Sequence, residues 1–444
     1  MIEAPSGGTA TGADEPKPFM RLPGNLRPLG YRNFALYWVG FVASHTGKNI
    51  ELVGAVWLIY QLTGSPLALG VLGLARALPQ LVLSPIAGVV VDRLDQRRLL
   101  FTTQGLSMIA SFTLGILVAL GVVEPWHVYL EIAAQSSILA FDAATRQALF
   151  PRLVPRALLP EAVTLSVTAA RSSAFLGPAI GGFMIAGLGE AAPFFANALT
   201  YIPLMVAVAL MRNIPPIPAR NEASFRAELV EGLRYLSATP VLRGLLRLEI
   251  VFSLFSVNPV IITIIATEVL GVGPEGLGGL LGADALGALI GVGTLLTLGQ
   301  PRRQGRFSIL STFAYAAALV AFAISQNYVL SFMALVACGI TDVFTAVTRM
   351  TIMQLSAPAQ MRGRIMANMR IITGGIGPLA ETQSGLLASL LGGPLAVITA
   401  AGALVGAAGW TARTNPAFWQ QKSDEPDVTE TPGSSTTAVT ARDA

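Results

Sequence analysis

Apolar stretches of about twenty residues, each able as a helix to cross a hydrocarbon core of ~30 Å, follow one another along nearly the whole chain. The pattern predicts an all-α membrane protein with twelve transmembrane helices. They are expected at residues 34–60, 66–91, 99–121, 126–149, 161–187, 191–212, 242–270, 275–299, 307–325, 328–355, 364–391 and 393–412. Composition agrees, because 12% of the residues are charged, against about 25% in a soluble domain.

Positive charge alternates between the connections. The connections at 61–65, 122–125, 188–190, 271–274, 326–327 and 392 contain no lysine or arginine. The other set of connections holds eighteen arginines: Arg21, Arg27, Arg32, Arg93, Arg97, Arg98, Arg152, Arg156, Arg212, Arg220, Arg226, Arg234, Arg302, Arg303, Arg306, Arg362, Arg364 and Arg413. By the positive-inside rule this set faces the cytoplasm, as do both chain ends. A wrong helix count would break the alternation.

Polar segments flank and divide the spans. Residues 1–30 have no apolar core for a cleavable signal and are expected to form a cytoplasmic arm, and residues 413–444 a disordered tail. The proline-bearing segment 213–241 separates two six-helix bundles, 31–212 and 242–412. Within it, Phe225, Leu229, Leu233 and Leu236 share one helical face. This face predicts an amphipathic helix on the membrane surface, with partner binding as the alternative.

The two predicted bundles repeat each other in sequence. Pro66 and Gly70 correspond to Pro274 and Gly278, and further along Arg146 corresponds to Arg349. Such halves are related by an axis along the membrane normal and can rock about a central site, exposing it to each side in turn.

The connection after the second span carries a recognisable motif. Its glycine, acid and arginines are Gly88, Asp92, Arg93, Arg97 and Arg98. The spacing resembles the signature loop G-x-x-x-D-R-x-G-R-[RK] of the major facilitator superfamily, although Asp95 and Gln96 replace a glycine and an arginine. The resemblance implies the major facilitator fold, with two six-helix bundles in pseudo-twofold symmetry, and a loop that latches one conformation. The alternative is a solvated basic loop that only sets orientation.

The fifth span resembles the G-x-x-x-G-P-x-x-G-G motif of antiporters in that superfamily. Its residues are Ser173, Gly177, Pro178, Gly181 and Gly182. Small residues permit close helix contact and proline permits a bend, so generic helix packing is the alternative meaning.

Further short sequence segments, at residues 60–66, 75–79, 152–160 and 362–364, resemble those of the branch that contains enterobactin exporters and macrolide-efflux proteins. The resemblance implies a monomer in the bacterial inner membrane that exports a siderophore or drug-like molecule in exchange for protons. Its partners would be that small molecule, protons and the lipid bilayer, without nucleic acid, and its energy source the proton gradient, without a cofactor. One departure is that Ile132 precedes Gln135 where drug antiporters of the family often have arginine.

Ionisable residues at mid-depth are functional candidates, because they are costly in hydrocarbon. Glu51, Arg76, Asp284 and Glu381 lie roughly 13–15 Å from the outer helix ends at ~1.5 Å per residue. We hypothesise that they line the central cavity and that at least one carboxylate exchanges protons; ion pairs that only fix helix register are the alternative. In the superfamily fold, helix 2 borders helix 11, so Arg76 and Glu381 could bridge the halves. Lys48 lies one turn from Glu51, near enough to pair with it.

Secondary candidates follow from the same reasoning. Asp142 and Arg146 are expected to pair with each other or with the Asp92 loop, and Arg349 is the counterpart of Arg146. Asn49 and Asn258 could contact substrate or bond to a neighbouring helix.

The alternatives to an exporter are an importer, an intramembrane enzyme, an ATP-driven pump and a membrane scaffold. A proton- or sodium-coupled importer has the same fold. An intramembrane enzyme is disfavoured, because the chain has two histidines, no H-E-x-x-H and no nucleophile–base set. An ATP-driven pump is disfavoured by the lack of G-x-x-x-x-G-K-[ST], and a non-transporting membrane scaffold is disfavoured as well. The substrate is not named by the residues.

Overall fold

The computed structural model describes residues 19–20, 22–211, 231, 234–299, 301–356 and 361–420, and every regular element in them is a helix. The N-terminal elements are η1 Gly24–Gly30, α1 Arg32–Thr63, α2 Pro66–Arg93, α3 Gln96–Ala119, α4 Pro125–Leu149, η2 Phe150–Arg152, η3 Arg156–Leu158, α5 Leu159–Leu188 and α6 Ala192–Leu210. The C-terminal elements are α8 Pro240–Phe255, α9 Pro259–Ile264, η5 Ile265–Val269, α10 Pro274–Leu298, α11 Gln304–Ile324, α12 Tyr328–Ser356, α13 Arg362–Leu391, α14 Gly393–Thr414 and α15 Pro416–Gln420.

Local chemistry sets the helix boundaries. Gly64 follows α1 in the left-handed region at φ 57°, which favours glycine. Ser65 then caps α2, its Oγ accepting from the backbone nitrogen of Ala68, and Pro66 occupies the first turn, where its missing N–H is not needed. Asp95 caps α3 by accepting from the backbone nitrogens of Arg97 and Arg98. The aspartate that replaces the signature glycine therefore starts a helix.

Eight helical segments are long and apolar enough by themselves to cross a membrane. They are α2, α3, α6, the run Pro240–Val269 formed by α8, α9 and η5, α10, α11, α12 and α14. α4 and α5 pass the same test only as a pair bent by 118°. The remaining long helices, α1 and α13, carry Glu51 and Glu381, so interior charge lowers their apolar character. Of the twelve spans predicted from the sequence, hydropathy thus supports eight as single helical segments.

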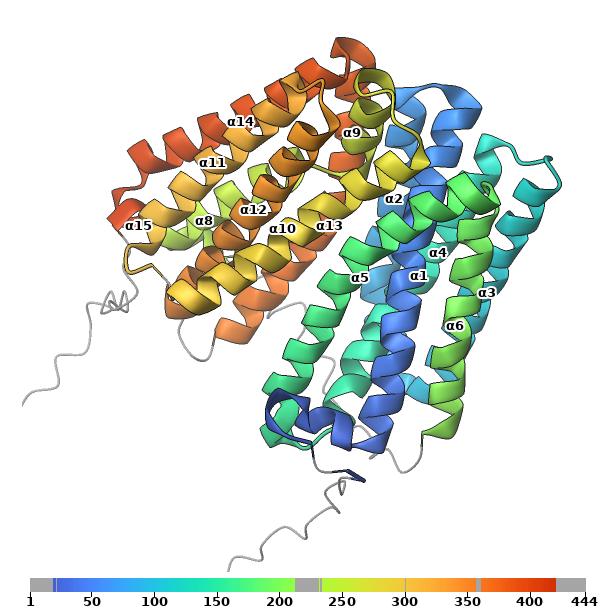
Figure 1. The fold of residues 1–444 in the computed structure, drawn as a ribbon. Coiled ribbons are helices and arrows are strands. Elements are labelled where there is room, and N and C mark those ends of the chain that lie inside the picture. Colours follow the sequence, from blue (N-terminus) through green and yellow to red (C-terminus); the bar gives the residue numbers. More distant parts are fainter. Residues whose placement is uncertain are drawn as a thin grey trace, which may run out of the picture.

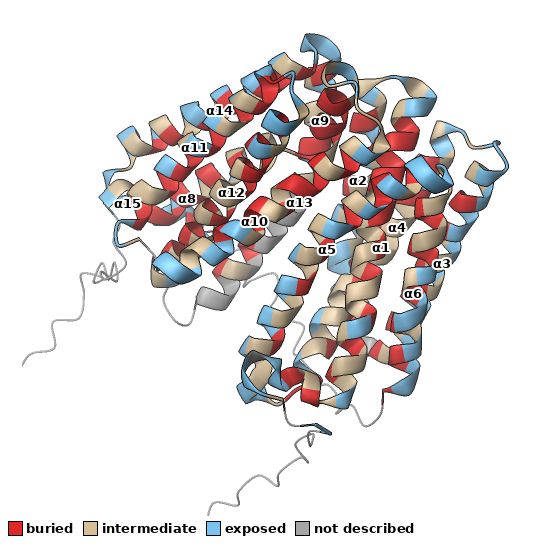
Figure 2. Ribbon diagram, in the orientation of Figure 1, coloured by how far each residue is buried: buried red, intermediate tan, exposed pale blue. Residues whose placement is uncertain are grey.

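The outer faces of the helices are apolar. Leu188, Leu296 and Leu298 are among many large hydrophobic side chains that are more than half exposed, and pale blue segments cover the outside of both groups of helices (Figure 2). A soluble protein rarely exposes apolar area on this scale, so lipid covers it. The chain is a multi-pass membrane protein.

The helices form two groups that converge at one end and diverge at the other (Figure 1). α1 to α6 make the first group, and α8 to α15 the second. The diverging end carries the arginine-bearing connections and both described chain ends, and we call it the arginine-rich end. Leu236 is buried there, whereas Phe225, Leu229 and Leu233 of the expected amphipathic helix lie outside the described residues.

The apolar core is shared at one end only. At the converging end a single cluster includes Leu69 and Phe194 of the first group and Ile261 and Leu277 of the second. At the arginine-rich end the core is split. One cluster, around Tyr37 and Leu204, draws only on the first group, and another, around Leu245 and Ile352, only on the second. The two halves are therefore held together by apolar contact at the converging end.

Two helix pairs make this junction, α2 with α13 and α5 with α10. Backbone approaches backbone at both, with Gly70 against Gly385 and Gly182 against Pro274. Glycine is needed here because any side chain would fill the space that the facing backbone occupies.

A methyl group at Gly182 tests this junction, because its Cβ would meet the carbonyl oxygen of Pro274 and the Cα of Glu275. We expect Gly182→Ala to destabilise the closed junction by ~1–3 kcal/mol, the usual penalty of overpacking. Ala388→Cys, placed on α13 in a Cys338→Ala background, should then react faster with a water-soluble maleimide. Gly187→Ala is the matched control, since its Cβ would meet nothing within 4 Å. Equal labelling rates in both variants would contradict the assignment.

Candidate functional site

The signature loop binds within its own half wherever its side chains are described. Arg97 donates to the carbonyl oxygens of Val208, at 2.9 Å, and Ala209, at 3.2 Å, and so caps the end of α6. Gln96 donates to the carbonyl of Val91 and accepts from Arg152. Arg98 is exposed, and a Cβ on Gly88 would meet nothing within 4 Å. The side chains of Asp92 and Arg93 lie outside the described residues, so the latch stays a prediction.

The helix 5 motif lies between α1 and α10. Ser173 accepts a 2.9 Å hydrogen bond from Thr46, and Gly177 and Gly181 lie against Asn49 and Ile50 of α1. Gly182 touches α10, and the carbonyl of Pro178 touches Gly278. The motif therefore joins a helix of its own half to a helix of the other half.

An ion pair crosses between the halves at the same junction. Arg76 of α2 donates from Nη1 to Oε1 of Glu381 on α13 at 2.5 Å. The guanidinium side chain is 23% exposed and the carboxylate 10%. The structure thus brings together the two residues expected to bridge the halves.

Glu51 lies inside the first half, in a polar network between α1, α3, α4 and α6. Its carboxylate accepts from Ser111 and from Asn197, each at 2.5 Å. Gln135 donates to the same Ser111 hydroxyl, and Asn197 also lies 3.3 Å from Tyr201. The carboxylate is therefore held by neutral donors, and its part in transport stays a prediction.

Glu131 of α4 lies beside Glu51 and is buried. Neither of its carboxylate oxygens has a hydrogen-bond partner among the described residues. Arg76 also acts on it electrostatically. A buried carboxylate without donors is costly, so this residue has a reason to be there other than stability.

A second charged cluster lies nearer the arginine-rich end of the first half. Asp142 accepts from Arg146 at 2.7 Å and from Gln104 at 2.7 Å, and Lys48 lies 3.7 Å from it. The expected Asp142–Arg146 pair is present. Lys48 is near enough to Glu51 on α1 to pair with it, but in the structure its ammonium lies against the aspartate on α4, and neutral donors bond to Glu51.

The second half has a counterpart of this cluster. Arg349, which the sequence repeat matches to Arg146, lies 2.9 Å from Glu249 on α8. Its guanidinium stands over the Phe252 ring at 4.7 Å, as that of Arg146 stands over Phe41 at 5.7 Å. In each repeat, an arginine of the fourth helix therefore lies beside an acid and over an aromatic ring of the first helix. The acid is on the fourth helix in the first repeat and on the first helix in the second.

The remaining candidates are dispersed. Asp284 is near Asp342 and Arg171 rather than Arg76. Asn258 caps α9 and donates to Ser384 on α13 at 2.8 Å, and Asn49 donates to the carbonyl of His45. Asn258 thus bonds to a neighbouring helix, whereas Asn49 bonds within its own helix, α1.

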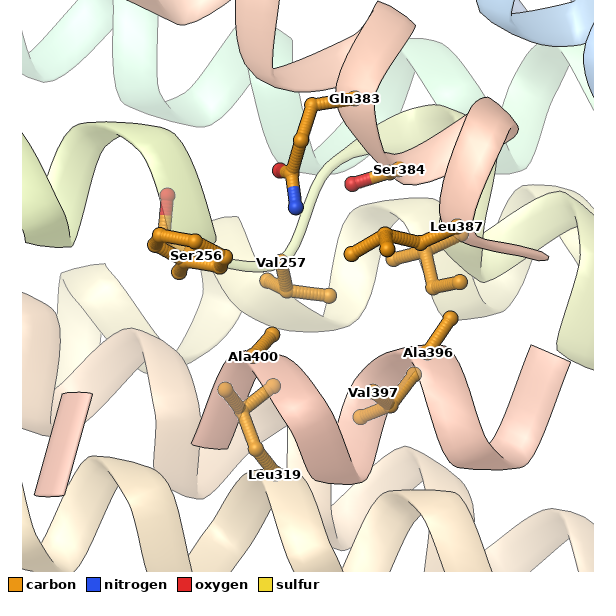
Figure 3. Close-up of a pocket in the computed structure, with 11 residues that line it drawn as sticks. Ser256, Val257, Leu319, Gln383, Ser384, Leu387, Ala396, Val397 and Ala400 are labelled. Atoms are coloured by element: carbon orange, nitrogen blue, oxygen red, sulfur yellow. The ribbon is translucent and has the colours of Figure 1, made fainter. Parts of the chain in front are cut away.

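No cavity found among the described residues is an evident substrate site. The one at the α8–α9 break, lined by Ser256, Gln383 and Ser384 (Figure 3), has a volume of about 10 Å³. That is about the space of one water molecule. Another, of about 370 Å³, lies at the arginine-rich end beside Arg243 and Arg247.

Sequence reasoning missed several partners in these networks. Glu131, Asp342 and Glu249 are ionisable residues within spans, and that signal alone could have found them. Ser111 and Asn197 had no such signal, because neutral polar residues are common in membrane helices and become significant only when a carboxylate faces them.

Comparison with known proteins agrees with this geometry, and the solved structures with a similar fold include membrane transporters. The nucleoside transporter NupG superposes with a TM-score of 0.70 at 11% identity, covering 88% of this chain and 100% of that one. A bacterial homologue of the human lysosomal transporter Spinster superposes at 0.66 with 13% identity, covering 88% and 96%. At these identities the likeness establishes the fold, and the predicted major facilitator fold is confirmed.

The family follows from the sequence match. The family described as a transmembrane secretion effector matches residues 23–432, and the chain belongs to this family of the major facilitator superfamily. The multidrug efflux pump Tap of Mycolicibacterium fortuitum is 28% identical over 359 residues, 78% of this chain and 87% of that protein. The enterobactin exporter EntS of Escherichia coli is 27% identical over 289 residues, 63% and 67% of the two chains. The resemblance inferred from the motifs is confirmed.

The Asp142 cluster makes a stability prediction. Asp142→Asn leaves Lys48 and Arg146 without the carboxylate between them, so we expect it to lower stability by ~3–5 kcal/mol, as breaking a buried pair does. Adding Lys48→Met should recover part of the loss by removing one uncompensated cation. Melting temperatures of the purified protein measure both effects. Asp95→Asn, an exposed helix cap that asparagine can also serve, is the control.

Proposed function

We propose that this protein exports small amphipathic molecules, siderophore-like or drug-like, across the cell membrane in exchange for protons. The observation that carries the proposal is the match to two exporters, one covering 78% and the other 63% of the chain. The arginine-rich end faces the cytoplasm in this proposal, with both chain ends, in keeping with the positive-inside rule.

The split core supports an alternating-access cycle. The halves share one apolar cluster at the converging end and have separate clusters at the arginine-rich end. The structure described here then corresponds to a carrier closed toward the outside. Transport would require the α2–α13 and α5–α10 contacts to part while the arginine-rich ends come together.

Buried carboxylates support proton exchange. Glu51, Asp284 and Glu381 all lie within the helices, and of the three only Glu381 has an ionic partner within hydrogen-bonding distance among the described residues. Carboxylates in low dielectric can gain and lose a proton as the surrounding contacts change, which couples the proton gradient to conformation.

Transport in inverted membrane vesicles tests the proposal, with ethidium as the probe. When the interior is acidified, an antiporter should accumulate ethidium inside, and a protonophore should abolish the accumulation. We expect Glu51→Gln, Asp284→Asn or Glu381→Gln to reduce this uptake at least tenfold, which corresponds to ~1.4 kcal/mol.

Glu190→Gln, in the connection between α5 and α6, is the matched control. Full proton-driven uptake in all three carboxylate variants would rule out these residues as proton carriers. Ethidium leaving acid-filled vesicles down the proton gradient would instead indicate a symporter, and thus an importer.

A further inference from the structure

Arg76 interacts with two carboxylates that belong to different halves of the protein. α2, which carries it, packs on α4 of its own half and on α13 of the other. In the structure the guanidinium bonds to Glu381 of α13 at 2.5 Å. Glu131 of α4 is within its electrostatic range.

Glu131 is poorly satisfied as an ionised group. Among the described residues, neither of its buried oxygens makes a hydrogen bond of ordinary geometry, although the Gln135 amide and the Glu51 carboxylate lie beside them. The donors nearby, Ser111 and Asn197, are already bonded to Glu51. Two ionised carboxylates in this position repel each other, and a proton on one of them removes the repulsion.

We propose that Glu131 competes with Glu381 for Arg76, and that a proton held by the Glu51–Glu131 pair decides which carboxylate the arginine binds. With the proton present, Glu131 is neutral and Arg76 ties α2 to α13, so the converging end stays closed. When the proton leaves to water, Glu131 becomes an anion and draws Arg76 toward α4. The tie between the halves is then lost.

The direction of this switch suits an exporter, and the inference rests on the proposed proton exchange. Proton release toward the arginine-rich end would loosen the opposite end and let it open. Uptake of a proton from the side of the open converging end would neutralise Glu131, return Arg76 to Glu381 and close the converging end again. One proton enters for each cycle in which the outward-open state is visited.

The other charged or titratable groups around Glu51 and Glu131 do not take the role of Arg76. Lys48 of α1 acts on Glu51 but is paired with Asp142. Tyr201 of α6 faces both glutamates and offers a hydroxyl rather than a charge. Among the cations described, Arg76 is the one that acts on Glu131 and also contacts the other half.

Distance measurement without any substrate tests the inference. Spin labels at Val122→Cys and Gln326→Cys, both in exposed connections at the converging end, report the separation of the halves in a Cys338→Ala background. In lipid nanodiscs we expect the label distance to be short at acidic pH and to lengthen as the pH rises. The same protein with Glu190→Gln should behave identically.

Two substitutions then separate the carboxylates. Glu131→Gln mimics the protonated state, so the distance should stay short at every pH. Glu381→Gln removes the partner across the interface, so the distance should be long at every pH. Glu131→Asp keeps an ionisable group and should retain the response, which guards against a result that comes from misfolding of the glutamine variant.

A pH-dependent distance change that is undiminished in Glu131→Gln would overturn the inference, as would a short distance in Glu381→Gln at every pH. The measurement distinguishes this failure from failure of the proposed function. If ethidium export proves to be proton-driven while Glu131→Gln keeps the full distance change, the exporter stands and the competition for Arg76 does not.

Discussion

A charged side chain inside hydrocarbon is costly unless it is paired, and ion pairs hold together much of the structure. The first half holds Lys48, Asp142 and Arg146 as one cluster, the second holds Arg349 with Glu249, and one pair, Arg76 with Glu381, joins the halves. The pairs within a half fix helices that must stay together. The pair between halves lies where a transport cycle would separate them, so the same interaction stabilises one conformation and resists the other.

Close backbone contact complements the charges. Gly182 and Gly278 let α5 and α10 approach, and Gly70 and Gly385 do the same for α2 and α13. Small residues bring the halves together by van der Waals contact alone, which is reversible in lipid because the tails make similar contacts when the helices part. The antiporter-like motif and the bridging ion pair therefore act on one junction.

The fold could be predicted from sequence to a large extent, because its determinants repeat along the chain. Apolar length and the alternation of arginines depend on many residues, so single errors do not change the outcome. The pairing of charged side chains in the site, by contrast, depends on single contacts between helices. Arg76 and Glu381 were anticipated because the family fold places their helices side by side. Helical spacing on α1 indicates Glu51 as a partner for Lys48, yet Lys48 pairs with Asp142 on α4. Contacts between helices depend on rotation about each helix axis, which spacing within one helix does not report.

The divided core has a consequence for how the protein tolerates change. Cavities made around Tyr37 or around Leu245 weaken one bundle and leave the other intact, since those clusters share no member. Around Leu69 and Leu277 the same change removes contact from both bundles at once. Substitutions in the shared cluster therefore alter the balance between conformations as well as stability. Variation that tunes turnover without unfolding the carrier should accumulate there, among buried apolar residues far from any ligand.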